Sequence, residues 1–382
     1  MKIVLIGTAY PYRGGLASFN ERLMQQFKDE GESVEIQTFS LQYPSFLFPG
    51  KTQFCEEKAS YDFKIERSVN SINPLSWIKV GRKLKREKPD IVIIKYWLPF
   101  MAPCFGSIAR IIKSNKHTRI IAIADNIIPH EKRFFDNCFT KYFVSSVDCW
   151  IAMSKSVLQD IDLFDKKSPR ILQPHPLFDN FGKAIERNEA LMQMNLDSNK
   201  VNLLFFGLVR EYKGLDLLFE ALSDERLKSL PINLVVAGEF YDNYSKYEEI
   251  VKKLGLENIV IMENKFIENN DVAKYFCACD LVVLPYKTAT QSGVTQIAYH
   301  FSKPMLVTNV GGLPEIVSDG KSGYVCEPNA KSIADCLIDF CQNKRDFSET
   351  LEIEKQRFGW DKMTAAIREL KTKKDNSNDN KK

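Results

Sequence analysis

Two cations and two glycines follow the apolar run VNLLFF, which begins at residue 201. The segment FGLVREYKGLDLL, residues 206–218, places Gly207 at the end of that run and Arg210 and Lys213 just before Gly214. Two cations beside the N-terminus of a helix form a clamp suited to a diphosphate. Taken alone, such a pair is equally well explained as solvated surface charge. A place beyond the carboxyl end of a parallel strand favours ligand binding, because ligands of open α/β sheets bind there.

A second segment, residues 284–312, combines small residues, hydroxyl groups and a Gly-Gly turn. Its sequence, LPYKTATQSGVTQIAYHFSKPMLVTNVGG, predicts a strand, a polar loop, a helix beginning near Ser292, a short buried strand and a turn. We expect Thr290 and Ser292 to cap the helix. Its first amides are then available to an anion; they belong to Ser292, Gly293, Val294 and Thr295. An ordinary strand–loop–helix explains the caps, but not three small-residue loops at strand ends of one domain.

The segment AIADNIIPHEKRFFD, residues 122–136, brings polar groups to the end of another predicted strand. Asp125 and Asn126 end the run RIIAIA, and His130 and Glu131 follow in a loop. Carboxylate and imidazole groups can orient a sugar hydroxyl or take its proton, so Asp125 and His130 are candidate acid/base groups. The start of a helix also explains a proline followed by Glu131.

Two further segments offer binding surfaces. In PYRGGLAS, residues 11–18, Gly14 and Gly15 permit a tight turn before a helix whose N-terminus suits a phosphate, although a packing turn remains an alternative. Aromatic side chains gather in residues 43–54 and in YWLPF, residues 96–100, which contains Trp97. Such rings can stack on sugars or dip into a membrane surface, and core packing also explains them.

Bulk composition narrows the class of protein. The 382 residues are enough for about two domains, and a net charge of +4 is too small to indicate nucleic-acid binding. Nine scattered cysteines predict free thiols in a reducing, cytoplasmic compartment, and four histidines without ligand spacing predict no metal site. The apolar run at the N-terminus is too short for a signal peptide, and no run is long enough to span a membrane.

Short apolar runs alternate with amphipathic stretches along most of the chain. Six runs in each half read as strands buried on both faces, which predicts an α/β protein with two doubly wound, Rossmann-like parallel sheets. We place the first domain at residues 1–178 and the second at residues 179–354. A last helix is expected at residues 355–372, and the polar tail, residues 373–382, is expected to be disordered.

Taken in order, these segments resemble a known family. The pieces YRGGLASFNERL, ADNIIPHE, FFGLVREYKGLDLLFEAL, VVAGEF, FIENNDVAKYFCACDLVVLPY and KPMLVTNVGGLPEIVSDGKSGYVCEP are similar to GT-B-fold retaining glycosyltransferases of family 4, glycosyl transferases group 1, over roughly residues 1–345. The resemblance implies two Rossmann-like domains facing across a cleft, with the acceptor bound by the first and the nucleotide sugar by the second. It also implies a last helix that crosses back to the first domain.

The resemblance further implies a metal-independent transfer from a UDP- or GDP-sugar to a glycan, lipid-linked or protein-linked acceptor, with retention of configuration. Acceptor contacts are implied for Asn126, Glu131 and Trp97. Donor contacts are implied for Gly14, Gly15, Gly207, Arg210, Lys213, Gly214, Glu239 of VVAGEF, and residues 290–296. The two glutamates usual in the donor site fall on Ala289 and Ile297. Neither can hold a hydroxyl, which makes Gln291 and Gln296 the nearby candidates.

Three functions follow from this pattern. The first is a glycosyltransferase for polysaccharide, lipid-linked or protein-linked glycan. The second is a catalytically silent subunit that binds a sugar nucleotide or acts as a scaffold, and the third is a GT-B sugar-nucleotide 2-epimerase, which the missing glutamates disfavour. The pattern indicates no oligomeric state, and the lysine-containing tail leaves open a peripheral contact with the inner face of a membrane.

Overall fold

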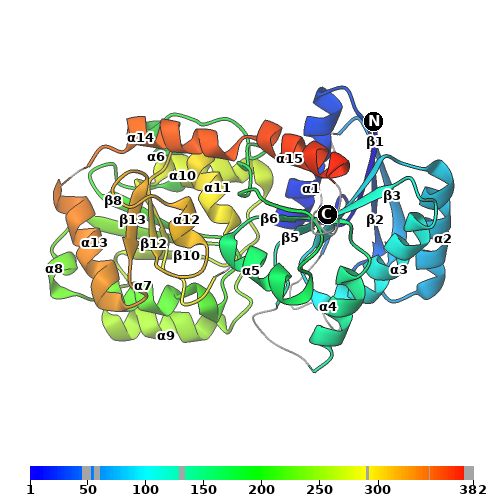
Figure 1. The fold of residues 1–382 in the computed structure, drawn as a ribbon. Coiled ribbons are helices and arrows are strands. Elements are labelled where there is room, and N and C mark those ends of the chain that lie inside the picture. Colours follow the sequence, from blue (N-terminus) through cyan, green and yellow to red (C-terminus); the bar gives the residue numbers. More distant parts are fainter. Residues whose placement is uncertain (45–52, 56–60, 129–133, 290–291, 344, 374–382) are drawn as a thin grey trace, which may run out of the picture. The chain divides into compact units, whose positions relative to one another are not determined.

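The chain forms two compact units. The computed structural model describes residues 1–44, 53–55, 61–128, 134–289, 292–343 and 345–373. The first unit comprises Met1–His175 and Gly359–Lys382, and the second comprises Pro176–Phe358. In each unit a sheet is covered by helices (Figure 1). The chain first passes from one unit to the other between His175 and Pro176, shortly before the predicted boundary at residue 178.

The first sheet has seven parallel strands in the order β3-β2-β1-β4-β5-β6-β7. The bounds are β1 (Lys2–Ile6), β2 (Ser33–Leu41), β3 (Lys64–Asn70), β4 (Ile91–Tyr96), β5 (Arg119–Ala124), β6 (Cys149–Ala152) and β7 (Arg170–Leu172). The helices of this unit are α1 (Gly15–Asp29), α2 (Pro74–Glu87), α3 (Ala102–Lys113), α4 (Asp136–Val144), α5 (Lys155–Phe164) and α15 (Trp360–Thr372). The predicted doubly wound parallel architecture is confirmed for this unit.

Strand β3 is an addition to the six strands that the sequence predicts in the first half. It lies at the edge of the sheet and pairs only with β2 among the described strands. Its sequence, KIERSVN, is mostly polar, and Lys64 pairs with Glu35 of β2 at 3.0 Å. Charged side chains are typical of edge strands, because they discourage pairing with other chains. This strand therefore leaves no continuous apolar run in the sequence, and such runs do not predict it.

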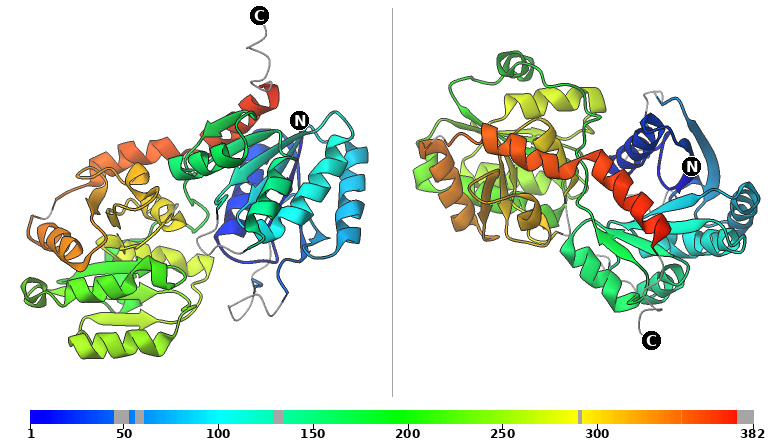
Figure 2. Two further views of the ribbon diagram at one scale, coloured as in Figure 1. Left: turned by 60° about the horizontal axis from the view of Figure 1, so that its bottom comes forward. Right: turned by 45° about the horizontal axis from the view of Figure 1, so that its top comes forward.

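The C-terminal helix α15 completes the first unit. The helix predicted for residues 355–372 is divided by a single 3-10 turn, η5 (Gln356–Phe358), between α14 (Ser348–Lys355) and α15. Helix α15, drawn in red, lies beside the blue α1 in Figures 1 and 2. Arg368 pairs with Glu30 at 2.6 Å, and Lys371 pairs with Asp90 at 2.8 Å. Four large side chains anchor its buried face: Trp360, Met363, Ile367 and Leu370.

The second sheet has six parallel strands in the order β10-β9-β8-β11-β12-β13. The bounds are β8 (Val201–Phe206), β9 (Ile232–Ala237), β10 (Val260–Glu263), β11 (Leu281–Leu284), β12 (Met305–Thr308) and β13 (Gly323–Cys326). Besides α14, the helices are α6 (Arg187–Met194), α7 (Leu215–Leu222), α8 (Glu225–Lys228), α9 (Tyr244–Leu254), α10 (Val272–Ala278), α11 (Gly293–His300), α12 (Leu313–Ile316) and α13 (Ala330–Asn343).

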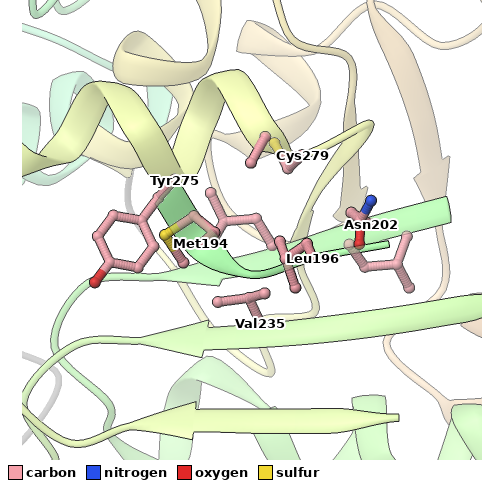
Figure 3. A pocket seen from close by; sticks show the side chains of 9 residues that line it. Met194, Leu196, Asn202, Val235, Tyr275 and Cys279 are labelled. Carbon is pink, nitrogen blue, oxygen red and sulfur yellow. The ribbon is translucent and has the colours of Figure 1, made fainter. Parts of the chain in front are cut away.

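The interior of the second unit is closely packed. Figure 3 shows the space beneath α6 and α10, where Met194 and Tyr275 lie over the strands and Asn202 points toward the same hollow. This hollow does not admit a water molecule. The Asn202 side chain accepts a hydrogen bond from Asn233 of the neighbouring strand at 3.0 Å. The hollow is therefore core packing rather than a ligand site.

Both sheets reverse their strand order at one place. In the first sheet β1 lies between β2 and β4, and in the second β8 lies between β9 and β11. Crossovers leave in opposite directions from such a point, which opens a crevice beyond the carboxyl ends of the two strands. All nine cysteines carry free thiols, and no described helix is both long and apolar enough to cross a bilayer.

Candidate functional site

Three glycines shape the carboxyl edge of the second sheet. A Cβ at Gly214, with φ +68°, would lie 2.0 Å from the carbonyl oxygen of Pro285. A Cβ at Gly238, with φ +152°, would lie 2.0 Å from the carbonyl oxygen of Gly207. Only glycine tolerates these approaches. The loops that follow β8, β9 and β11 are therefore drawn together at the switch point.

Lys213 lies at the centre of this edge. It ends the short 3-10 helix η3 (Glu211–Lys213), which leads into Gly214 and α7. Its side chain is only 8% exposed, and its Nζ lies 5.6 Å from the ring centroid of Tyr286. A Cβ at Gly207 would lie 3.4 Å from that Nζ, so the ammonium sits against the backbone at the end of β8.

No acidic side chain in the described parts of the chain pairs with Lys213. Burial, and to a smaller extent the nearby Arg210 guanidinium, lower the pKa of Lys213 to about 8. A buried ammonium without a counter-charge is costly, and the usual remedies are a paired anion or loss of the proton. The site therefore holds a buried positive charge that an anionic ligand can neutralise.

Arg210 is the second predicted cation of the clamp. Its guanidinium lies over the ring of Tyr241, 5.0 Å from the centroid. Glu239, which follows β9, is 6% exposed, and its carbonyl accepts the backbone amide of Val209 at 2.9 Å. The structure thus brings Gly207, Arg210, Lys213 and Gly214 to one edge of the sheet, with Glu239 on the adjoining strand end.

Helix α11 presents its first turn at the same edge. Gly293 is its first residue, and the Cγ2 of Val294 would lie 3.6 Å from a Cβ at Gly207. Ser292 occupies the predicted N-cap position of α11, but the expected capping bond is wrong, because its side chain accepts no amide of the helix. The Ser292 hydroxyl instead lies 3.1 Å from the hydroxyl of the fully buried Tyr286. A buried phenol needs a partner, and that need outweighs capping.

The polar residues around this turn have different fates. The hydroxyl of Thr295 donates to the carbonyl of Ser292 at 2.6 Å and so steadies the turn. Gln296 is fully buried, and neither polar atom of its side chain has a hydrogen-bond partner among the described residues. An unpartnered buried amide is rare and calls for an explanation. Thr290 and Gln291 lie outside the described residues.

In the first unit, Asp125 follows β5 and pairs with a lysine that belongs to none of the predicted site motifs. Its Oδ1 lies 2.9 Å from Nζ of Lys95 on β4. Lys95 is 1% exposed and Asp125 14%. The strands bring them together, since the amide of Asp125 donates to the carbonyl of Tyr96 at 2.9 Å. A single lysine within the apolar run IVIIKY is the feature of the sequence that could have indicated Lys95.

The remaining predicted residues of the first unit lie near the ends of its strands. Gly14, with φ +100°, caps α1, and Gly15 is its first residue. Trp97 follows β4, and its indole N–H donates to the Tyr43 hydroxyl at 2.7 Å. Asn126 follows Asp125 and is partly buried. His130 and Glu131 fall outside the described residues.

Comparison with known proteins adds an independent view of this architecture. The structure of Anabaena HepE in complex with UDP aligns with 97% of this chain and 99% of its own, with a TM-score of 0.73 at 17% identity. This chain has the GT-B fold. The structure of HepE in complex with UDP-glucose is also similar to this chain, with a TM-score of 0.72 at 15% identity over 97% of this chain and 100% of that one.

Sequence comparisons agree with the GT-B assignment. Residues 200–343, which contain the whole second sheet, match the family described as Glycosyl transferases group 1. An uncharacterized glycosyltransferase of Methanocaldococcus jannaschii is 24% identical over 97% of this chain and 97% of its own length. The O-antigen chain mannosyltransferase C of Escherichia coli is 23% identical over 92% of this chain and 91% of its own.

Proposed function

We propose that this chain is a glycosyltransferase that moves a sugar from a nucleoside diphosphate donor to a glycan, lipid-linked or protein-linked acceptor. The observation that carries the proposal is the buried Lys213, which has no acidic partner among the described residues and lies at the switch point of the second sheet. A diphosphate supplies the missing negative charge. The match of residues 200–343 to a glycosyltransferase family supports this assignment.

In the proposed donor site, the diphosphate lies against the backbone at Gly207 and Gly214. Lys213 and Arg210 neutralise its charge, and the first-turn amides of α11, at residues 292–295, donate hydrogen bonds to its oxygens. The same contacts stabilise the charge that grows on the diphosphate as the glycosidic bond breaks. This arrangement accounts for a leaving group stabilised by protein groups alone, which is the metal-independent reaction that we propose.

The sugar end of the donor requires hydrogen-bonding side chains. Glu239 and Gln296, with Gln291, are our candidates for its hydroxyls. Gln296 is the most informative of these, because its amide is fully buried and has no partner among the described residues. A ligand hydroxyl can satisfy both its donor and its acceptor. Hydrophobic Ile297 and small Ala289 occupy the positions of the usual glutamate pair. In this proposal, the side chains that hydrogen-bond the donor sugar therefore differ from the family pattern.

The first unit supplies the acceptor side in this proposal. Asp125 and His130 act on the acceptor hydroxyl, by orienting it or taking its proton, and Asn126, Glu131 and Trp97 bind the acceptor. Gly14 and Gly15 give close backbone approach at the N-terminus of α1. The proposed transfer retains the anomeric configuration. The names of the sequence relatives, among them an O-antigen chain mannosyltransferase, support a product at the cell surface. We propose that the enzyme acts in the cytoplasm, a reducing compartment that its free thiols favour.

A thermal-shift and turnover screen tests the function. UDP, GDP and their sugars are added to the purified full chain, and release of the nucleoside diphosphate is then followed for each sugar donor. UDP-glucose is the first donor to try, since HepE has been solved with it. We expect at least one donor to raise Tm and to be turned over, because a ligand bound by the native state stabilises it. A chain that binds and cleaves none of them contradicts the proposal.

A further inference from the structure

Lys95 is an unexpected residue in its strand. Strand β4 has the sequence IVIIKY and is buried along its whole length. The lysine Nζ lies 3.6 Å from the ring centroid of Phe19 on α1 and 3.8 Å from the sulfur of Met153, just beyond β6. Asp125, just beyond β5, provides its ion pair at 2.9 Å. One ammonium therefore joins four elements at the carboxyl edge of the first sheet.

Stability alone does not explain this ion pair. Removing two charges from water is costly, and apolar replacement of a buried pair is often neutral or stabilising. The pair is also asymmetric: Lys95 is 1% exposed, whereas Asp125 is 14% exposed. The lysine thus lies behind the carboxylate, which keeps some access to the surface. This geometry fixes the orientation of Asp125 from the protein side.

We propose that Lys95 is a positioning residue of the transfer reaction, which holds the carboxylate of Asp125 in the orientation that the acceptor hydroxyl requires. This role rests on the proposed function and deepens it. Lys95 has no access to a substrate of its own and acts through Asp125. Its place on β4 and its contact with Phe19 on α1 also tie Asp125 to the switch point between β1 and β4.

A second ion pair in the same unit provides a matched control. Lys113, at the end of α3, lies 2.6 Å from Asp148. Asp148 precedes β6 and accepts the amide of Ile120 at 2.8 Å, so this pair lies at the amino edge of the sheet. Its lysine is 34% exposed. Lys113→Met therefore removes an Asp–Lys pair from the same sheet without touching the edge that carries Asp125.

The test compares donor hydrolysis, in which water takes the place of the acceptor hydroxyl, in Lys95→Met, Asp125→Asn, the double variant and Lys113→Met. The donor is the one selected by the screen, starting with UDP-glucose, and kcat is expressed per folded molecule. We expect Lys95→Met to lower kcat by roughly 10- to 100-fold, because misplacement of a reacting group has effects of this size. Donor KM should change little, and Lys113→Met should keep the wild-type kcat.

The double variant separates positioning from other roles. If Lys95 acts only through Asp125, Lys95→Met/Asp125→Asn is no slower than Asp125→Asn, since the effects of residues acting as a unit do not add. Wild-type kcat in Lys95→Met, or a further loss in the double variant, overturns the proposal. If Lys95→Met does not fold, the kcat of the double variant is compared with that of Asp125→Asn, and a lower value in the double variant overturns the proposal. A wild-type chain without turnover instead contradicts the proposed function.

Discussion

Lys95 and Lys213 are both buried at the carboxyl edge of a parallel sheet, one in each unit, and they differ in what neutralises them. Nζ of Lys95 lies 2.9 Å from Oδ1 of Asp125, so a carboxylate of the protein neutralises this lysine. Lys213 has no acidic partner among the described residues, and its neighbours include the ring of Tyr286, the backbone at Gly207 and the like charge of Arg210. Burial lowers the pKa of both lysines, and Asp125 opposes that lowering for Lys95.

The difference indicates two uses of a buried cation. A lysine whose charge is matched within the protein can hold a side chain in place but has little electrostatic attraction left for a ligand. A lysine whose charge is unmatched destabilises the ligand-free protein and gains most when an anion arrives. We therefore propose that the first unit uses its lysine for geometry and that the second unit uses its lysine for binding.

The largest expected effect comes from breaking the matched pair on one side. Asp125→Asn leaves the Lys95 ammonium buried without its counter-charge. We expect the free energy of unfolding to fall by about 3 kcal/mol, as for other buried pairs that lose one partner. Denaturant unfolding at pH 7 measures the change. Lys95→Met/Asp125→Asn should recover most of the loss, and a double variant as unstable as Asp125→Asn would contradict a matched pair.

Lys213→Met should weaken binding of UDP by about 100-fold, because a charge-assisted contact to a phosphate is lost from a buried site. Isothermal titration calorimetry at pH 7 measures the affinity. Lys303→Met is the matched control, since Lys303 lies beyond the other end of α11 and donates to the carbonyls of Cys277 and Cys279 at 3.3 and 2.9 Å. Equal loss in both variants would show a general effect of unfolding.

An effect of the opposite sign is expected without ligand. Lys213→Met should raise the stability of the ligand-free chain at pH 7, by about 3 kcal/mol at most, because the pKa of Lys213 falls from 10.5 to about 8 on folding. In the wild type, stability should rise with pH between about 8 and 10.5, where only the unfolded state keeps the proton. Denaturant unfolding at pH 7 and pH 9 measures both changes. A variant less stable than the wild type at pH 7 would mean that Lys213 has a partner in the protein.

Most of the fold could be predicted from the sequence, because strands covered on both faces leave continuous apolar runs. Runs such as VNLLFF and INLVVA are buried along almost their whole length in the structure. The edge strand β3 could not be found in this way, because its exposed side needs no apolar residues. Lys64, Glu66 and Arg67 interrupt its pattern.

The candidate site could be predicted only in part. Glycines at strand ends, such as Gly207 and Gly214, mark places where the backbone must approach closely, and this signal is local in the sequence. The pairing of Lys95 with Asp125 depends on the register of two neighbouring strands, which one sequence does not display. The hydroxyl of Ser292 was assigned to a cap, because the competing buried Tyr286 becomes its neighbour only in the fold.

The most direct test of the account is the proton balance of UDP binding at pH 9. Lys213 is then mostly neutral in the free chain, because its pKa is about 8, and a bound diphosphate restores its charge. We therefore expect uptake of close to one proton, measured by calorimetry in buffers of different ionisation enthalpy, and an affinity about tenfold lower than at pH 7. Lys213→Met should take up none. Uptake that persists in this variant, or binding without uptake by the wild type, would contradict Lys213 as the cation that meets the diphosphate.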